Sequence, residues 1–259
     1  MLSRTVLVEM SRFKKLPLAY TEKDYLNDIC LNEISRYRTA LVFKGGTALY
    51  KFYKLNRFSE DLDFSINKRK FDYEMLKKRV GRSFGLLNIE VVTAQLEAHQ
   101  RGATIVFMIK GPLYNGSRES LARLPMDFSS RERPREHKMV QYRSLYNEIP
   151  PMEICVMDKE EITAEKVRAI LTRNKPRDVF DLWFLLDSGV DIEEQLVDRK
   201  LKLYDSPFSL EGLISALEEK RGLWETDLRN KVIGRLPEFD VVIEDIKKRF
   251  RKAIGEKKG

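Results

Sequence analysis

The sequence predicts an α+β protein in which strands and helices are mixed up to about residue 157 and helices alone follow. Three observations lead to this class. Short apolar runs bounded by glycine and proline, typical of strands, recur between residues 41 and 157. Several of these runs are closely spaced, which favours antiparallel neighbours. From Asp158 onward the apolar residues recur at the three- and four-residue spacing of helices. The change predicts two domains, residues 1–157 and 158–259.

In the first half of the N-terminal domain, capping residues and glycines predict where helices and strands begin and end. Thr21 is a candidate cap for a helix over residues 22–36. The apolar run at 41–43 predicts a buried strand, which Gly45-Gly46 ends. Thr47 then caps a short helix to Tyr53, and a turn at 56–59 leads into a strand over 61–66.

The second half of this domain is richer in strands. A helix is expected over residues 71–84, with Gly85 ending it. Strands are expected at 88–96, 103–110, 122–129 and 152–157, and the polar, basic stretch 129–148 is expected to be an exposed loop.

The C-terminal domain begins with a helix start signal. Asp158 and Glu161 match a capping box, and the helix is expected to run to Arg173. Pro176 suits the first turn of a second helix, which Gly189 caps.

Composition limits the functional classes. The net charge of +8 and the pI of about 9.3 favour a polyanionic partner such as a nucleic acid, although a basic soluble protein without such a partner has the same composition. The two cysteines lack metal-ligand spacing, and neither a signal peptide nor a membrane-spanning run stands out. We therefore expect a cytoplasmic protein with no membrane partner. The two histidines are isolated, which argues against Ser/His/Asp or Cys/His catalysis. The sequence also lacks the glycine loops of Walker-type NTPases and of protein kinases.

Three aspartates are the candidate metal ligands. In a strand, Asp61 and Asp63 point to one side and Leu62 and Phe64 to the other. Asp127 lies opposite the apolar residues of a later strand and could join them. Carboxylates hold Mg²⁺ against substrate phosphates, the Gly45-Gly46 turn lets backbone N–H groups approach a phosphate, and the Ser59 hydroxyl could donate to one. The alternatives are an exposed Asp-x-Asp pair and a turn serine.

A second group of charged residues lies between 163 and 186. Lys166 could reach a triphosphate, and Asp181 could reach Lys166 or the metal site. Arg177 and Asp178 share the helix of Asp181. The alternative is a salt-bridged pair of amphipathic helices without a ligand.

Both groups match one family. The motifs are Lys-Gly-Gly-Thr-Ala-Leu (44–49), Arg-Phe-Ser-Glu-Asp-Leu-Asp-Phe (57–64) and a Glu-Lys-Val-Arg to Asp-Val-Phe-Asp-Leu segment (165–182). With them the sequence resembles the AbiEii/AbiGii toxin-type nucleotidyltransferases, within the polymerase-beta-like nucleotidyltransferase superfamily. The resemblance implies a mixed β-sheet flanked by helices, followed by a helical C-terminal region that completes the active site.

The resemblance also implies Mg²⁺ (or Mn²⁺) and an NTP substrate. It places metal at Asp61, Asp63 and, less directly, Asp127. It places the catalytic residues at Asp61, Asp63, Lys166 and Asp181, and nucleotide contacts at Gly45, Gly46, Thr47, Ser59, Lys166 and Arg177. One departure is that the superfamily often has Gly-Ser where this chain has Gly45-Gly46.

Two functions are therefore compared. The first is Mg-dependent transfer of NMP from an NTP to an acceptor hydroxyl, expected to be on RNA such as tRNA. The enzyme would be the toxin of a toxin–antitoxin or abortive-infection system with a cognate antitoxin. The second is an inactive protein of the same fold that binds a nucleotide, RNA or a partner. If the first holds, we expect Lys166 and Asp181 to lie across a cleft from Asp61 and Asp63.

Overall fold

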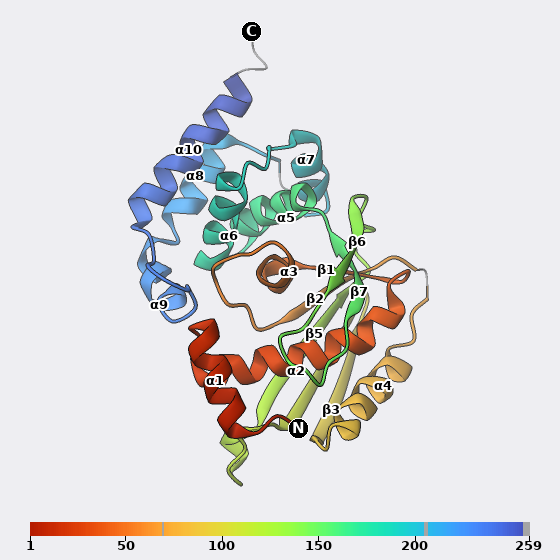
Figure 1. Cartoon of the computed structure of the whole chain (residues 1–259). Coiled ribbons are helices and arrows are strands. Elements are labelled where there is room, and N and C mark those ends of the chain that lie inside the picture. Colours follow the sequence, from red (N-terminus) through yellow and green to blue (C-terminus); the bar gives the residue numbers. More distant parts are fainter. Residues whose placement is uncertain (69, 205–206, 256–259) are drawn as a thin grey trace. The chain divides into compact units, whose positions relative to one another are not determined.

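The structure is a computed structural model that describes residues 1–68, 70–204 and 207–255. The described chain forms two compact units. The first contains Met1–Lys54 and Phe58–Met157. The second contains the chain from Asp158 onward together with the short segment Leu55–Arg57, which belongs to it although it lies far earlier in the sequence. Figure 1 colours these elements along the chain.

The first unit is built on a mixed sheet of seven strands in the order β3-β4-β5-β2-β1-β7-β6, counted over the described residues. The β1–β7 and β2–β5 pairs are parallel, and the others are antiparallel. This is the α+β fold that the sequence predicts, with β3, β4 and β5 antiparallel as expected. The strands are β1 (Leu41–Lys44), β2 (Leu62–Ile66), β3 (Glu90–His99), β4 (Gly102–Lys110), β5 (Ala122–Ser129), β6 (His137–Tyr142) and β7 (Met152–Met157).

Helices cover one face of this sheet. They are α1 (Arg4–Lys14), α2 (Leu18–Ile34), α3 (Gly45–Phe52) and α4 (Tyr73–Leu86), with short 3-10 turns at Ser35–Tyr37 and Arg118–Ser120. The long helix α2 and helix α4 run over the strands (Figure 1). Apolar side chains of β2 and β5 pack beneath them in one core, and alternation along each strand leaves the intervening polar residues on the opposite face. Leu62 and Phe64 belong to that core.

Several expectations for this unit are wrong. Thr21 and Thr47 are not helix caps, because α2 begins at Leu18 after Pro17 and α3 begins at Gly45 after Lys44. The stretch 129–148 contains strand β6, which pairs with β7 along its whole length. It is an edge strand with mostly exposed polar side chains, so it lacks the apolar run that marks a buried strand. Gly85 does not end α4, which continues to Leu86. A Cβ built at Gly85 would meet nothing within 4 Å, so no close contact requires a glycine there.

The second unit is helical in its described part. It contains α5 (Lys159–Thr172), α6 (Pro176–Asp187), α7 (Glu194–Lys202), α8 (Leu210–Glu218), α9 (Trp224–Leu228) and α10 (Phe239–Gly255), with a 3-10 turn at Arg221–Leu223. Pro176 stands at the start of α6, as the sequence predicts. The segment Leu55–Arg57 joins this unit through a bridge between Arg57 and Val232 and a hydrogen bond from the Ile233 N–H to the Asn56 carbonyl, 2.7 Å.

Among the described helices, none combines the length and the apolar character needed to cross a membrane.

Candidate functional site

A row of polar side chains crosses the sheet on the face opposite the helices. Asp63 of β2 is the register partner of Asp127 on the parallel strand β5 and of Lys44 on β1. Thr104 of β4 is in register with Asp127, and its hydroxyl donates to an Asp127 carboxylate oxygen at 2.6 Å. Neighbouring strands lie about 4.8 Å apart, so the two aspartates are adjacent on one face. This register places Asp127 beside Asp63.

The glycine turn lies directly against Asp63. Gly45 has φ +76°, a backbone conformation that favours glycine. A Cβ built at Gly45 would lie 2.6 Å from Asp63 Oδ2. Any side chain there would clash with the carboxylate as well as strain the turn. The Gly45-Gly46 turn and the Asp-x-Asp motif, which are separate features in the sequence, therefore form one site in the first unit.

The other predicted residues of this unit lie around that turn. Asp61 precedes β2 by one residue, and its carbonyl accepts a hydrogen bond from the buried Thr47 hydroxyl at 2.5 Å. The Thr47 side chain thus fastens α3 to the aspartate motif. Asp61 is half-buried, like Asp63, while Leu62 between them is fully buried. Ser59 is half-buried two residues before Asp61.

The donor set fits a hard divalent cation bound with its substrate. Asp63 and Asp127 supply adjacent carboxylate oxygens, the ligand type that Mg²⁺ prefers. Among the described residues, no three His, Cys, Asp or Glu side chains form a closed metal cage. Mg²⁺ commonly takes one or two protein carboxylates and completes its shell with phosphate oxygens and water. The residues present therefore fit such an ion.

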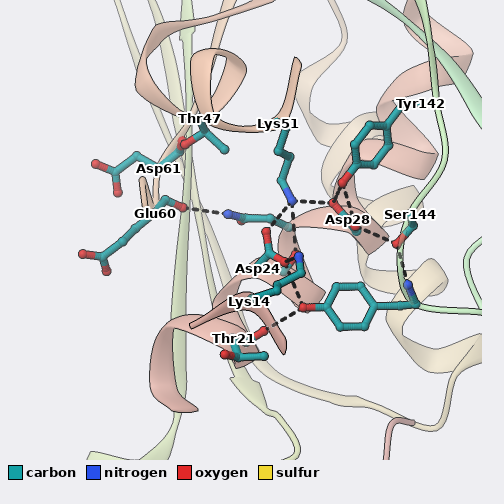
Figure 2. Close-up of polar contacts among 12 residues, drawn as sticks. Lys14, Thr21, Asp24, Asp28, Thr47, Lys51, Glu60, Asp61, Tyr142 and Ser144 are labelled. Atoms are coloured by element: carbon teal, nitrogen blue, oxygen red, sulfur yellow. Dashed lines mark hydrogen bonds and ion pairs between the residues drawn. The ribbon is translucent and has the colours of Figure 1, made fainter. Parts of the chain in front are cut away.

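Beneath this site, α3 is held to α2 by a buried charge network (Figure 2). Lys51, in the last turn of α3, donates to Asp24 at 2.6 Å and to Asp28 at 2.5 Å. Both carboxylates are completely buried. The remaining polar contacts come from Lys14 and Tyr146 to Asp24 and from Tyr142 and Ser144 to Asp28. In Figure 2 the side chains of Glu60 and Asp61 point away from this network.

The pKa values of the two buried aspartates are shifted in opposite directions. Burial raises the pKa of Asp24, but Lys51 and Lys14 outweigh it and bring the pKa to about 2. Burial dominates at Asp28, whose pKa is raised despite Lys51. The pKa of Lys51 is itself raised, because the two carboxylates outweigh the effect of burial. Lys51 therefore stays protonated and Asp24 ionised across the neutral range.

The second unit contains its own buried charge cluster. Lys166 Nζ lies 2.9 Å from Asp178 Oδ1 and 2.7 Å from Asp181 Oδ2. Arg57 donates to both oxygens of Asp181, at 2.9 Å each. Arg173 donates to both oxygens of Asp178, at 2.7 and 2.8 Å. Three cations thus surround two carboxylates, and the cluster keeps one positive charge.

The protonation states follow from these pairs. Burial raises the pKa of Asp178, but Lys166 and Arg173 outweigh it and leave the pKa well below its ordinary value. Burial lowers the pKa of Lys166, but Asp181 and Asp178 outweigh it and leave the pKa raised. Lys166 is therefore a cation at neutral pH. Arg177, by contrast, lies near Asp227 of α9. Burial raises the pKa of Asp227, but Lys231, and after it the charge and backbone N–H of Arg177, leave that pKa lowered.

Arg57 is the functional candidate that sequence reasoning missed. It opens the 57–64 motif, yet no role was expected for it. Arg57 lies two residues before Ser59 in the chain. Its side chain is 1% exposed and is held by hydrogen bonds to Asp181. The available signal was the position of an arginine directly beside a predicted site motif. The expectation that Lys166 and Asp181 face Asp61 and Asp63 relates one unit to the other and stays a prediction.

Residues 30–253 match the family model described as nucleotidyl transferase AbiEii toxin, type IV TA system. The chain belongs to this family and is a nucleotidyltransferase of the toxin type.

Solved structures have the same fold. MenT4, a nucleotidyltransferase toxin from Mycobacterium tuberculosis, is 20% identical with a TM-score of 0.63, and the match covers 96% of this chain and 89% of MenT4. JHP933 from Helicobacter pylori is 22% identical with a TM-score of 0.57, and the match covers 93% of this chain and 97% of that protein. No curated protein matches the sequence significantly.

Proposed function

We propose that this chain transfers NMP from an NTP to a hydroxyl of an RNA acceptor, such as a tRNA end, in a Mg²⁺-dependent reaction. The observation that carries the proposal is the contact between the Gly45 turn and the Asp63 carboxylate, with Asp127 in register beside it. A turn that offers backbone N–H groups suits phosphate, and adjacent carboxylates suit the cation that accompanies phosphate. The net charge of +8 favours a nucleic acid as the acceptor.

The residues of the first unit have distinct tasks in this proposal. Gly45, Gly46 and Thr47 form the first turn of α3, and their backbone N–H groups bind phosphate oxygens. The Ser59 hydroxyl donates to a further phosphate oxygen. Asp61, Asp63 and Asp127 hold Mg²⁺ or Mn²⁺, which when bound neutralises charge on the triphosphate and activates the acceptor hydroxyl.

The residues of the second unit contribute charge and order. Lys166 supplies a permanent positive charge for the triphosphate, because its two carboxylate partners keep it protonated. Asp181 is fully buried and held by Lys166 and Arg57, which supports a positioning role for it. The place of Arg177 near Asp227 favours stabilisation of the helical unit over nucleotide contact.

The test is incorporation of each of the four labelled NTPs into total RNA, with pyrophosphate release followed in parallel. We expect Asp63→Asn to reduce both signals to background, because the substitution removes a carboxylate while conserving shape. Asp61→Asn is expected to do the same. The matched control is Glu9→Gln, which neutralises an exposed carboxylate of α1 in the same unit. Tight nucleotide binding without pyrophosphate release by the unmodified chain would instead support an inactive binding protein.

The family description also supports a role in a toxin–antitoxin system. We propose that the chain acts in the cytoplasm as the toxin, with a cognate antitoxin as partner. Growth arrest on expression, abolished by Asp63→Asn and relieved by co-expression of the neighbouring gene, is the expected result. Arrest by the Asp63→Asn variant would contradict a toxicity that depends on nucleotidyl transfer.

A further inference from the structure

A cavity of about 460 Å³ opens between the end of α2 and the outer side of α4, on the helical side of the first unit. It is separate from the carboxylate row, which lies on the opposite face of the sheet. Its lining is unusually rich in arginine. It consists of Glu33, Arg36, Met75, Arg79, Arg82, Ser83 and Leu86.

The floor of the cavity is a fixed ion pair. Glu33 is 6% exposed, and its carboxylate accepts from Arg79 at 2.6 Å, with Arg36 at 3.3 Å and the Ser83 hydroxyl at 3.4 Å. The Arg79 guanidinium also lies 5.9 Å from the centre of the Tyr37 ring. One carboxylate thus orders the lining but neutralises only one of its three arginines.

The remaining charge is accessible. Arg36 and Arg82 are exposed, and within the described part of the chain Arg82 makes no ion pair. Lys78 extends the positive charge along α4 beyond the cavity. Helix α4 contains four basic residues and one acidic residue, so its 14 residues account for +3 of the net charge of +8.

The shape of this charge indicates its ligand. Guanidinium groups match phosphate oxygens as a fork. The charge continues outside the cavity, which suits a polyanion with repeated phosphates better than a single acidic side chain. Met75 and Leu86 leave apolar surface beside the arginines, being 51% and 75% exposed, and this surface suits the edge of a sugar or base.

We propose that this cavity is an anchoring site for the phosphodiester backbone of the acceptor RNA, away from the carboxylates at which transfer takes place. The proposal rests on the proposed function in taking RNA as the acceptor. Backbone contacts position a nucleic acid without reading its sequence. The cavity therefore contributes affinity for RNA and none for the NTP.

The test measures binding apart from chemistry. A fluorescein-labelled RNA hairpin with a single-stranded 3′ end is titrated with the full chain in 50–200 mM KCl, and anisotropy gives Kd. The variant Arg36→Ser/Arg82→Ser should weaken binding at least about 10-fold and flatten the slope of log Kd against log salt by about 1.5, since each phosphate contact contributes roughly 0.7 to 0.9. Its KM for NTP should be unchanged.

Two further variants separate the site from general effects. Arg4→Ser/Arg12→Ser removes the same charge from exposed positions on α1 and should change Kd less than about 2-fold. Glu33→Gln removes the acidic group of the lining and should tighten binding, a gain that misfolding cannot produce. An unchanged Kd for Arg36→Ser/Arg82→Ser, or an equal loss in the α1 control, overturns the proposal. Competition by poly-glutamate as effective as by RNA, in amounts matched by charge, overturns it in favour of an acidic protein partner.

The two proposals can fail separately. If the hairpin binds in a manner that depends on Arg36 and Arg82 but no NTP is incorporated into any RNA, the cavity stands as an RNA-binding site and the transfer proposal falls. If Arg36→Ser/Arg82→Ser modifies RNA with an unchanged KM for the RNA, the anchoring site falls and the transfer proposal stands.

Discussion

Single charged residues in this chain derive their properties from burial and partners together. Asp24 is the clearest case, since it is completely buried yet has a pKa of about 2 because Lys51 and Lys14 outweigh burial. A carboxyl whose pKa is lower in the folded state stabilises the fold above its unfolded pKa, about 3.9. The stabilisation disappears as pH falls toward 2, where folded and unfolded states both bind the proton.

This predicts a pH-dependent cost for Asp24→Asn. At pH 6 the variant should lack about 2 kcal/mol of pH-dependent stability that the unmodified chain has, because the pKa of Asp24 falls from 3.8 to about 2 on folding. The difference should narrow between pH 4 and pH 2. Urea unfolding at several pH values measures it. The difference includes a smaller change at Asp28, because the pKa of Asp28, which burial raises, is raised further by the Asp24 charge. A difference that stays constant over this range would contradict the prediction.

At the scale of elements, α3 is the part on which the proposed site depends. It is only eight residues long, so local propensity cannot fix it. Thr47 ties its first turn to the Asp61 carbonyl, and Lys51 ties its last turn to α2. The buried network therefore keeps the Gly45 turn in place against Asp63.

Replacing Lys51 should release this helix. Lys51→Met leaves Asp28 without its cation and Asp24 with Lys14 alone, and breaking a buried pair in this way costs about 3–5 kcal/mol. The double variant Lys51→Met/Asp28→Asn should regain part of the loss, because it removes one uncompensated charge. Lys78→Met, at an exposed position of α4, serves as the control and should change stability by less than about 0.5 kcal/mol. A loss from Lys51→Met no greater than that of the control would show that the network does not hold α3.

The same element shows how far sequence reasoning reaches. The strand at 41–44, the short helix after it and the aspartate strand were all predictable, because apolar runs and glycine punctuation are local signals. The motif residues of the proposed site were identified from the family resemblance, and their roles stay predictions. The partners of Lys51 were not predictable, because Asp24 and Asp28 lie 27 and 23 residues earlier, and nothing in a helix of ordinary polar composition marks which carboxylates become buried. Strand β6 was missed because an edge strand lacks the apolar pattern of a buried one.

On the scale of the whole molecule, the chain has two centres of burial. The main apolar cluster draws its members only from residues 2–156, in the first unit. The second unit packs its helices around other residues, with Phe180, Trp183 and Trp224 in ring contact. Units with their own cores are able to unfold separately. Arg57 belongs to the second unit even though both flanking segments belong to the first.

This division can be followed with the chain's own probes. Both tryptophans, Trp183 and Trp224, lie in the second unit, so tryptophan fluorescence reports its unfolding. The amide I infrared band of β-strands, which is resolved from that of helices, reports the strands, all of which lie in the first unit among the described residues. Arg57→Met leaves the buried Asp181 with Lys166 as its remaining cation. It should lower the free energy of unfolding of the second unit by about 3 kcal/mol, and with it the urea midpoint of the fluorescence transition. Lys51→Met should move the infrared transition of the strands and leave the fluorescence midpoint in place. If each variant moves both transitions equally, the chain unfolds as one cooperative unit, and the charge clusters stabilise the whole molecule and not the unit in which each lies.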